Sequence, residues 1–491
     1  MEHHEVVIIG AGISGLAAAE LLDKHKVEYV IIEARDRIGG RIETNRKGLT
    51  EYDLGASWAH DTLTNPLFDK ILEDNEIHNL YSLYYDDQYP LYFTKDRGPQ
   101  YVSSNKIEQV VKELEKFIEI RYFEEIGKRD VSLKEIIAEY IRKQSRVLTK
   151  EQVLLAPQLA RHLELWHGIG WEQMSSKFGL VDNVGRNCLF RNGYDKVIEQ
   201  IHSKLDQNKI LKNSIVKLID RSTSTVKIEL TDGRVINSNW VICTVPQSIL
   251  QLPIGEIGAI EWRPSLPANI KGSLDNMSWG KLGKVVFEFD TAWWGHHDTD
   301  RFVALANSDN QLFEVWCQST GASAKVGHTQ PSPPSPESWD SPLLILNFHK
   351  IKNTPALLCF TQGTLTEYLE ENPDRAWGYM EPILSRLANV DLDSDETQDN
   401  RVQVTPPANT IVSQWTVDPF SRGSYAACQP GDDPTDLVIH LERGLDKVRF
   451  AGEHTILDGA GAVHGAWMSG RREAEHILIR EGKLEGELNE W

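Results

Sequence analysis

Cysteine is scarce in this chain of 491 residues, which contains five of them. The five are scattered, odd in number and never spaced as C-x-x-C, so the sequence excludes a disulfide-stapled scaffold and a thiol redox motif. Such usage is typical of buried thiols in a reducing compartment. Long apolar runs are absent as well. No stretch of about 18 apolar residues occurs, and we therefore expect no membrane-spanning helix.

Positive charge is in deficit. The 52 Lys and Arg residues are outnumbered by 72 Asp and Glu residues, which gives a formal net charge of −20 at pH 7. This balance argues against nucleic acid and against an anionic membrane as partners. An acidic surface would also attract cationic small molecules, although solubility is the commoner reason for such a surface.

Targeting signals are lacking too. The first recognisable motif begins within ten residues of Met1, which leaves no space for a leader peptide, and residues 487–491 are not a peroxisomal tripeptide. We therefore expect a cytoplasmic protein. Its length and its 40% hydrophobic and 25% charged residues are typical of a globular protein with two or three domains.

Residues 6–33 have the features of a dinucleotide-binding unit. An apolar strand at 6–9 leads into Gly10, Gly12 and Gly15, which have G-x-G-x-x-G spacing; helix-forming residues follow, and a second buried strand at 30–32 precedes Glu33. The first glycine permits a tight turn, the second lets the backbone approach a pyrophosphate, and the third lets the helix pack on the strand. The helix N-terminus offers free N–H groups and the positive end of its dipole to the phosphates.

Glu33 narrows the choice of nucleotide. It follows Gly15 by 18 residues, a position where an acid accepts hydrogen bonds from a ribose diol. An acid at this position favours a free 2′-hydroxyl, and hence FAD or NAD over NADP. The alternative interpretation is a glycine-rich turn in an unrelated α/β protein.

The segment Ala-Arg-Asp-Arg-Ile-Gly-Gly-Arg at 34–41 follows directly. Two adjacent glycines before Arg41 suit a loop whose backbone passes close to phosphate while the guanidinium pairs with it; a turn with a solvated arginine is the alternative. Together with the preceding glycine motif and acid, this segment resembles the signature of the flavin-containing amine oxidase family. The resemblance implies FAD as cofactor, bound in part by Arg35, Gly40 and Arg41.

Three further segments resemble the fungal polyamine (spermine) oxidases of this family. They are DLGASWAHDTLTNPLF at 53–68, LELWHG at 163–168 and SRGSYAACQPGDDP at 421–434. The resemblance extends over nearly the whole chain. A fungal corticosteroid-binding protein belongs to the same branch, which supplies a second hypothesis of function.

The resemblance implies an α/β fold in which a Rossmann-like FAD-binding domain is interleaved with a mixed-sheet and helical substrate domain. We expect residues 1–80, 195–265 and 405–491 to form the first domain, and residues 81–194 and 266–404 the second. Amphipathic periodicity predicts a helical cap with helices near 105–126, 132–146 and 150–167. Apolar and alternating runs predict strands at 215–219, 225–230, 240–245, 282–289, 343–348 and 356–360, a hairpin turn at 231–234, and a helix over 381–387.

The resemblance also assigns the remaining cofactor contacts. Small residues at 55 and 56 would admit a closely packed ring system, and small residues at 459–462 would let N–H groups of the last helix reach the flavin O2 and N1. The backbone of Val216 would hold the adenine. Ser424 occupies the position of the cysteine that joins the flavin in monoamine oxidases, so we expect non-covalent FAD. The assigned residues are Gly55, Ala56, Ser57, Trp58, Val216, Trp415, Gly452, Glu453, Gly461 and Ala462.

Catalytic roles are implied for His60, Lys284 and Tyr425. A lone histidine is more often structural, and a lysine at the start of a strand usually points to water. The resemblance implies instead that His60 faces the substrate nitrogen, that Lys284 holds a water against flavin N5, and that the ring of Tyr425 stands at the flavin face.

Substrate contacts are predicted for His60, Asp87, Trp166, Tyr425 and His464. Trp166 would line the tunnel, with burial in a helical core as the alternative. Either Asp86 or Asp87 would pair with a distal ammonium group, with a solvated turn as the alternative. We predict no metal site.

These expectations combine into a FAD-dependent polyamine oxidase. Hydride would leave the carbon beside a secondary amine of spermine or a related polyamine for the flavin. Hydrolysis would give an aminoaldehyde and a shorter polyamine, and O₂ would be reduced to H₂O₂. The alternatives are a steroid-binding flavoprotein on the same scaffold and an NAD-linked dehydrogenase. The sequence leaves open the preferred polyamine, the bond that is cleaved, and whether the protein is a monomer or a homodimer.

Overall fold

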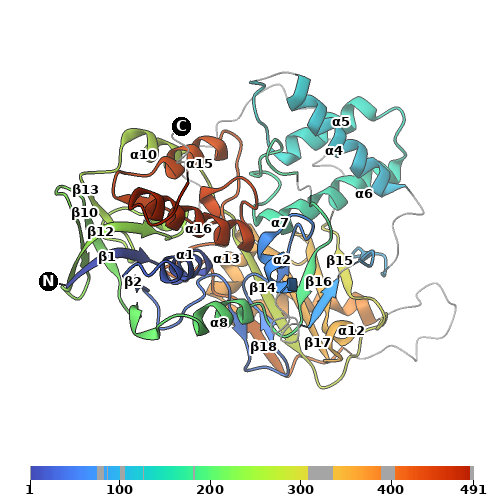
Figure 1. The fold of residues 1–491 in the computed structure, drawn as a ribbon. Helices are drawn as coiled ribbons and strands as arrows, with labels where there is room; N and C mark the ends of the chain where they lie inside the picture. Colours follow the sequence, from blue (N-terminus) through green and yellow to red (C-terminus); the bar gives the residue numbers. More distant parts are fainter. Residues whose placement is uncertain are drawn as a thin grey trace.

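The computed structural model of the chain describes residues 2–73, 82–85, 87–99, 106–124, 127–180, 183–307, 335–388 and 404–486. In these ranges, two large β-sheets occupy the two halves of the molecule, and a group of helices stands over the second half (Figure 1). Asp86 lies outside the described residues. The expected α/β class, with one Rossmann-like sheet and a second mixed sheet with helices, is confirmed.

The first sheet has the strand order β13-β10-β11-β12-β1-β2-β9, and β19 pairs with the carboxyl half of β12. β1 runs parallel to both β2 and β12, and all four residues of β2 are buried, as expected for a strand covered on both faces. The strands and the hairpin turn predicted in this region are confirmed, although β1 and β12 begin earlier than expected. The bounds are β1 Glu2–Ile9, β2 Tyr29–Ile32, β9 Ile210–Leu211, β10 Val216–Asp220, β11 Val226–Leu230, β12 Val235–Cys243, β13 Glu261–Arg263 and β19 Val448–Phe450.

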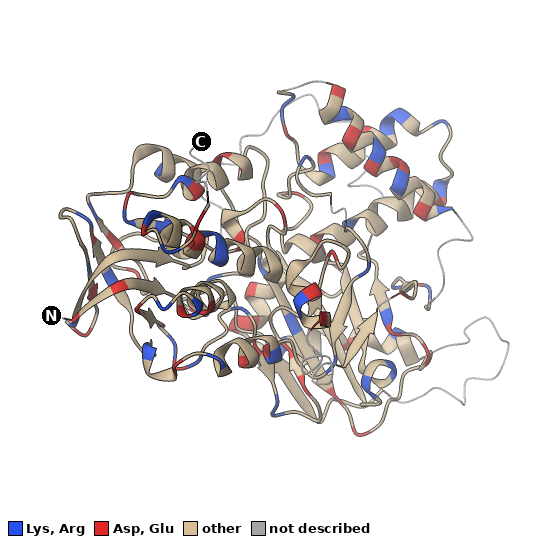
Figure 2. Cartoon of the chain, viewed as in Figure 1, with Lys and Arg blue, Asp and Glu red and all other residues tan. Residues whose placement is uncertain are grey.

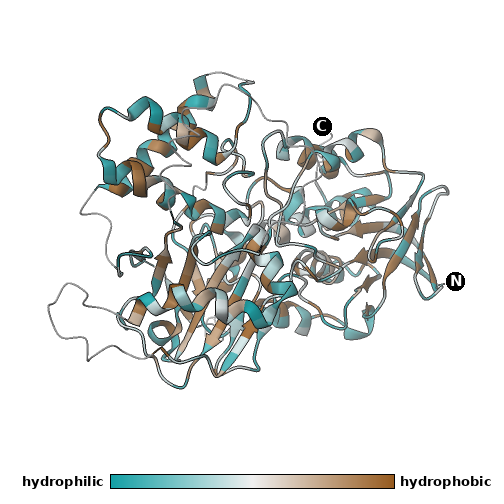
Figure 3. Cartoon of the chain, turned by 180° about the vertical axis from the view of Figure 1, so that it is seen from behind, coloured by the Kyte–Doolittle hydropathy of each residue, from teal (hydrophilic) through white to brown (hydrophobic). Residues whose placement is uncertain are grey.

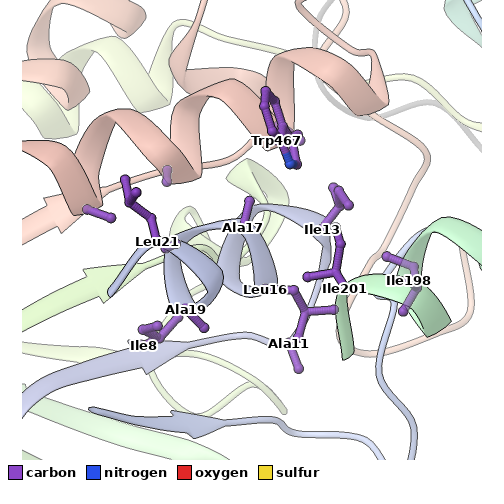
Figure 4. Close-up of a cluster of buried hydrophobic side chains, with 14 of the residues drawn as sticks. Ile8, Ala11, Ile13, Leu16, Ala17, Ala19, Leu21, Ile198, Ile201 and Trp467 are labelled. Atoms are coloured by element: carbon purple, nitrogen blue, oxygen red, sulfur yellow. The ribbon is translucent and has the colours of Figure 1, made fainter. Parts of the chain in front are cut away.

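Helices cover both faces of this sheet, because alternate residues of β1 and β2 point to opposite faces. One face packs against α1 (Ile13–Lys24), α2 (Pro66–Glu73), α8 (Asp195–Ser203) and α16 (Val463–Arg480). The other face packs against α10 (Ala268–Asp275) and α15 (Pro434–Arg443). Figure 4 shows Trp467 of α16 over Ala17 of α1, with Ile8 on the opposite side of α1.

α1 and α16 pack closely enough to require a glycine. A Cβ atom added at Gly470 of α16 would lie 2.0 Å from the carbonyl oxygen of Ser14 in α1. Within the described residues, α1 and α16 are the first and last helices, and their backbones are in contact, far closer than larger side chains would permit.

The second sheet has the strand order β18-β14-β17-β16-β15-β7 and is antiparallel except for the β15–β7 pair. One face packs against α13 (Gly363–Glu371) and α14 (Ala376–Leu384). The helix expected over 381–387 is the end of α14 followed by a 3₁₀ turn, Ser385–Ala388. The strand predictions are confirmed. In the view from behind, much of this sheet has the brown colour of hydrophobic residues (Figure 3). The bounds are β7 Leu91–Phe93, β14 Leu282–Glu288, β15 Arg301–Ala304, β16 Leu343–Asn347, β17 Ala356–Gln362 and β18 Asn409–Val412.

The helical cap consists of α4 (Ile107–Glu124), α5 (Leu133–Gln144) and α6 (Lys150–Ala160), which share one buried cluster. Capping boxes at Ser132 and Thr149 fix where α5 and α6 begin. Charged residues of both signs cover the outer faces of these helices (Figure 2). The single helix expected over 150–167 is wrong in detail: α6 tightens into a 3₁₀ turn, Arg161–Leu163, before a short helix, α7 (Glu164–His167).

Short elements complete the described chain. Among its helices, none combines the length and the apolar composition that crossing a bilayer requires. The remaining elements are the pair β3 Thr44–Asn45 and β4 Tyr52–Asp53, the three-stranded sheet of β5 Trp58–Ala59, β8 Cys188–Phe190 and β6 Leu83–Tyr85, the helices α9 Gln247–Leu250 and α12 Phe348–Lys352, and the 3₁₀ turns Gln207–Lys209, Pro373–Arg375 and Glu453–Thr455.

Candidate functional site

A large cavity is lined by both sheets and by α7, the short helix that follows the cap. It brings together residues that are hundreds of positions apart in the sequence. Twenty of the predicted site residues line it: Gly10, Gly12, Glu33, Arg35, Gly40, Arg41, Gly55, Ala56, Ser57, Trp58, His60, Trp166, Val216, Lys284, Trp415, Tyr425, Gly452, Glu453, Gly461 and Ala462.

The glycine turn between β1 and α1 forms one end of the cavity. Gly10 has φ +106°, and a Cβ atom there would lie 2.4 Å from Oγ1 of Thr244. Gly12 is the N-cap of α1 and provides no side-chain hydrogen bond, so the first N–H groups of the helix lack side-chain acceptors from the cap. Gly15 does not line the cavity: its added Cβ atom would meet the carbonyl oxygen of Gly10 at 2.0 Å, which fits a helix-packing position.

Hydrogen bonds from two backbone N–H groups hold the side chain of Glu33 in place. Its two carboxylate oxygens accept hydrogen bonds from the N–H groups of Ala11 and Arg35, each at 2.8 Å, and the residue is buried. The Arg35 guanidinium turns to Asp418, with Nη2 2.7 Å from Oδ2, and it also donates to Oγ of Ser421. Glu33 and Arg35 both line the cavity, so a carboxylate and a paired guanidinium lie at this end.

The Gly39-Gly40-Arg41 loop crosses the glycine turn. The N–H group of Gly39 donates to the carbonyl oxygen of Ala11 at 2.9 Å. The Arg41 guanidinium donates to Glu453 Oε1 at 2.8 Å and to the carbonyl oxygen of Ser424 at 2.7 Å. Through Arg41, this loop is therefore hydrogen-bonded to residues near the carboxyl end of the described chain, at the edge of the cavity.

Lys284 is buried, with 4% of its surface exposed, so the usual expectation that a lysine at the start of a strand points to water is wrong here. Its Nζ donates to the carbonyl oxygens of Asp53 at 2.8 Å and Gly55 at 2.5 Å, and to Oγ of Ser57. Three acceptors match the three hydrogens of an ammonium group. The ring centroids of Phe360 and Trp58 lie 5.0 and 5.8 Å from Nζ.

Burial changes the proton affinity of Lys284 and of the nearest buried acid. Burial lowers the pKa of Lys284 to about 8, against the opposing effect of the Asp53 carboxylate. Burial raises the pKa of Asp53 to about 6, although hydrogen bonds from Thr44 and Tyr194 and the charge of Lys284 oppose the rise. Burial therefore brings the pKa of this lysine closer to neutrality than that of an exposed lysine.

His60 follows β5 and faces Asn187, which precedes the paired strand β8. The ring Nδ1 lies 2.8 Å from Oδ1 of Asn187. Because this oxygen only accepts, Nδ1 carries the hydrogen in the neutral ring, and Nε2 keeps its lone pair. Burial lowers the pKa of His60, whereas the hydrogen bond to Asn187 and the charge of Asp61 raise it.

Tyr425 stands beside the amino end of α16. Its hydroxyl donates to the backbone carbonyl of Trp166, and burial, followed by the charge of Glu453, raises its pKa. A Cβ atom added at Gly461, where φ is +74°, would lie 3.3 Å from the tyrosine ring. Ala462 is the N-cap of α16 and provides no side-chain hydrogen bond, so a second helix N-terminus opens at the cavity.

Two predicted substrate residues lie elsewhere. Asp87 is exposed and pairs with Arg186 at 2.9 Å, away from the cavity lining. His464 is 2% exposed and lies behind the lining, 3.8 Å from Asp61 between Nε2 and Oδ2. Their roles in substrate binding stay predictions.

Several lining or supporting residues were missed from the sequence. Leu344 and Phe360 enter the cavity from β16 and β17, Leu165 enters from α7, and Asn187 and Asp418 orient His60 and Arg35. Strand alternation could have placed Phe360 on the same face as Leu358. Nothing in the sequence around Asn187 or Asp418 indicates their contacts with His60 and Arg35.

The arrangement fits a dinucleotide with a ring system. Helix N-termini without side-chain caps, a carboxylate held by backbone N–H groups and crowded glycine backbone all contribute to the lining. The lining also includes apolar and aromatic side chains: Trp58, Leu165, Trp166, Leu282, Leu344 and Phe360. Among the described residues, no group of three or more His, Cys, Asp and Glu side chains is arranged to hold a metal ion.

Comparison with known proteins gives a consistent result. The family model for flavin containing amine oxidoreductases matches residues 13–478. The corticosteroid-binding protein of Candida albicans is 35% identical, with 96% of each chain covered. Polyamine oxidase 4 of Oryza sativa subsp. japonica is 26% identical over 97% of this chain and 90% of its own. Lysine-specific histone demethylase 1 homolog 2 of Arabidopsis thaliana is 25% identical over 96% of this chain and 58% of its own.

Gly10→Ala should weaken binding of the dinucleotide by roughly tenfold or more, because the methyl group meets Thr244 and the backbone conformation is strained. Flavin content after purification and the dissociation constant for added FAD measure the effect. Gly233→Ala is the matched control, since Gly233 has φ +88° but no heavy atom within 4 Å of an added Cβ atom. Equal loss of flavin in both variants would contradict the assignment of this turn.

Proposed function

The chain belongs to the family of flavin containing amine oxidoreductases, and from this premise we propose that it is a FAD-dependent polyamine oxidase. The substrate is a secondary amine of spermine or of a related polyamine, and the products are an aminoaldehyde, a shorter polyamine and H₂O₂. The observation that carries the proposal is one cavity in which dinucleotide-binding features meet His60 and Lys284. Polyamine oxidases among the relatives support the substrate class.

FAD fits the residues that line the cavity. The ribose would bind Glu33, the pyrophosphate would lie at the N-terminus of α1 and the Gly40-Arg41 loop, and the adenine would lie beside Val216, where β10 has a bulge. The isoalloxazine would face the 55–58 segment and the N-terminus of α16. Bound FAD supplies a hydride acceptor that O₂ can reoxidise.

The domain boundaries belong to the same proposal. Residues 1–80, 195–265 and 405–491 form the FAD-binding domain, and residues 81–194 and 266–404 the substrate domain. Most strands support this division, since β1, β12 and β19 share the first sheet and β14 to β17 share the second. Two elements depart from it: β18 (Asn409–Val412) pairs with β14 in the second sheet, and α10 (Ala268–Asp275) packs on the first.

His60 prepares the substrate nitrogen. An alkyl ammonium has a pKa of about 10, so most of the amine arrives protonated at neutral pH. The lone pair of nitrogen must be free before the neighbouring carbon can lose hydride. With Nδ1 bonded to Asn187, the Nε2 atom of His60 can accept a hydrogen bond or a proton from the amine.

Lys284 serves the cofactor side of the cavity. As an ammonium, it fixes the carbonyl groups of Asp53 and Gly55 and thereby the segment on which the ring system would rest. Because its pKa is about 8, the neutral form is accessible near neutrality, and its lone pair can then accept a hydrogen bond from a water molecule.

The rest of the substrate would lie in an aromatic slot. Trp58, Trp166, Phe360 and Tyr425 offer ring faces that attract a distal ammonium group and exclude water. Tyr425 stays protonated because its pKa is raised, so it contributes shape and a hydroxyl rather than charge. A role for Asp87 would require movement of its exposed ion pair.

A second function is supported by a specific observation. The relative of Candida albicans is named a corticosteroid-binding protein, and leucines at 165, 282 and 344 add apolar surface to the slot. A steroid would fit such a surface without using the proton chemistry of His60.

A peroxide-release screen with spermine, spermidine and acetylated spermine separates the two functions. We expect H₂O₂ from at least one polyamine, with little displacement of labelled corticosteroid at the same amine concentration. Tight steroid binding without peroxide from any polyamine would favour the alternative.

Acid precipitation tests how FAD is held. Because residue 424 is serine and its Oγ accepts a hydrogen bond from the N–H group of Leu282, no thiol is available there for a covalent link. We expect a yellow protein whose flavin is released into the supernatant. Colour retained in the washed pellet would refute non-covalent binding.

Lys284→Met should slow reduction of the flavin by polyamine, or its reoxidation by O₂, by roughly tenfold or more while FAD stays bound. Anaerobic stopped-flow absorbance measures the first rate, and mixing of reduced enzyme with O₂ measures the second. Lys281→Met is the control, because Lys281 pairs with Glu367 outside the cavity lining. Unchanged rates in Lys284→Met would remove its proposed role.

A further inference from the structure

Asp61 and His464 form a titratable pair beside His60 that the chemistry above does not use. Asp61 follows His60 directly and has φ +54°, a left-handed conformation that asparagine and aspartate tolerate better than most residues. Its Oδ1 accepts a hydrogen bond from the N–H group of Val184 at 2.8 Å. Its Oδ2 lies 3.8 Å from Nε2 of His464.

His464 lies in the first turn of α16 and is almost wholly buried. The loop before the helix folds tightly against its ring, since a Cβ atom added at Gly459 would lie 2.4 Å from Nε2. The amino end of an 18-residue helix favours a negative charge and disfavours an imidazolium. The Asp61 carboxylate therefore lies beside the first turn of α16, next to the His464 ring.

A positive charge on the buried ring of His60 is unfavourable, and the Asp61 carboxylate reduces this cost. Burial makes the ring a poor proton acceptor, and Asn187, its hydrogen-bond partner, is neutral. Asp61 is the charged group that favours protonation of His60. The groups that act on His464 are Asp61 and Asp458, which favour its protonation, and His60, which opposes it. Asp458 is exposed.

We propose that Asp61, held at the amino end of α16 beside His464, is the counter-ion that allows His60 to take a proton from the substrate ammonium. The inference rests on the function proposed above for His60. In this step, one N–H bond of the ammonium breaks, its electron pair stays on the amine nitrogen, and the proton binds Nε2 of His60. Nδ1–H remains bonded to Asn187, and the new positive charge is balanced by Asp61.

His464 then has a different role from the substrate contact that the sequence predicted. It does not line the cavity, so it acts through Asp61 rather than on the substrate. Asp61 and His464 are then positioning residues, and their effect should be on proton affinity rather than on the shape of the slot.

The test compares wild type with Asp61→Asn, which keeps the acceptor for Val184 and removes the charge. Side-chain NMR of labelled histidine gives the titration of His60 directly, with His60→Gln and His162→Gln for assignment. His162 is the internal reference, because burial lowers its pKa and its ring bonds only to the carbonyl oxygen of Leu159. Asp458→Asn is the matched control, because it removes a carboxylate that acts on His464.

We expect His60 to titrate at a higher pH than His162 in wild type and to shift to lower pH in Asp61→Asn, but not in Asp458→Asn. The acid limb of kcat/KM for polyamine should shift to lower pH in Asp61→Asn, and kcat at neutral pH should fall roughly tenfold because the base is weaker. An unchanged His60 titration in Asp61→Asn would overturn the inference.

Two further results keep the inference separate from its premise. If Asp61→Asn does not fold, the wild-type titration decides, and a His60 that titrates at or below the pH of His162 overturns the inference. If wild type releases no peroxide from any amine, the proposed function fails, while the NMR comparison still reports whether Asp61 sets the proton affinity of His60.

Discussion

The buried ammonium of Lys284 joins the two halves of the molecule. The lysine belongs to β14 of the second sheet, and its acceptors belong to the 53–57 segment, which begins at the last residue of β4. A charge in this position is costly unless every hydrogen is bonded, and here each one has an acceptor. The cavity between the sheets depends on this link, because the same segment provides the small residues that form its floor.

The nucleotide-binding half could be predicted from the sequence because its signals are local. Gly10 and Gly12, the buried strands around them and Glu33 lie within one short stretch, and each has a physical reason at its own position. The α/β fold and most strands of both sheets were predicted for the same reason: an apolar run or alternation shows which faces are buried. The helix expected over 150–167 was wrong because apolar spacing alone does not show where a helix tightens and stops.

The partners of the site residues could not be predicted in this way. Arg35 pairs with Asp418 and His60 with Asn187, and each pair is joined only by the tertiary fold. Family resemblance placed His60 and Lys284 at the cavity but gave no reason for their proton affinities, which depend on burial and on neighbours such as Asp53. Asp87 and His464 were predicted as substrate contacts, yet neither lines the cavity, because the local sequence does not show which way a side chain of a loop or helix end faces.

The close packing of α1 against α16 has a consequence for how the protein is made. The ribosome synthesises β1, α1 and β2 early, yet α16, which covers one face of this unit, is synthesised hundreds of residues later. During synthesis the apolar surface of α1 around Ala17 therefore stays without its native cover, and chaperones have a long interval in which to bind it. This half can be completed only after α16 has left the ribosome.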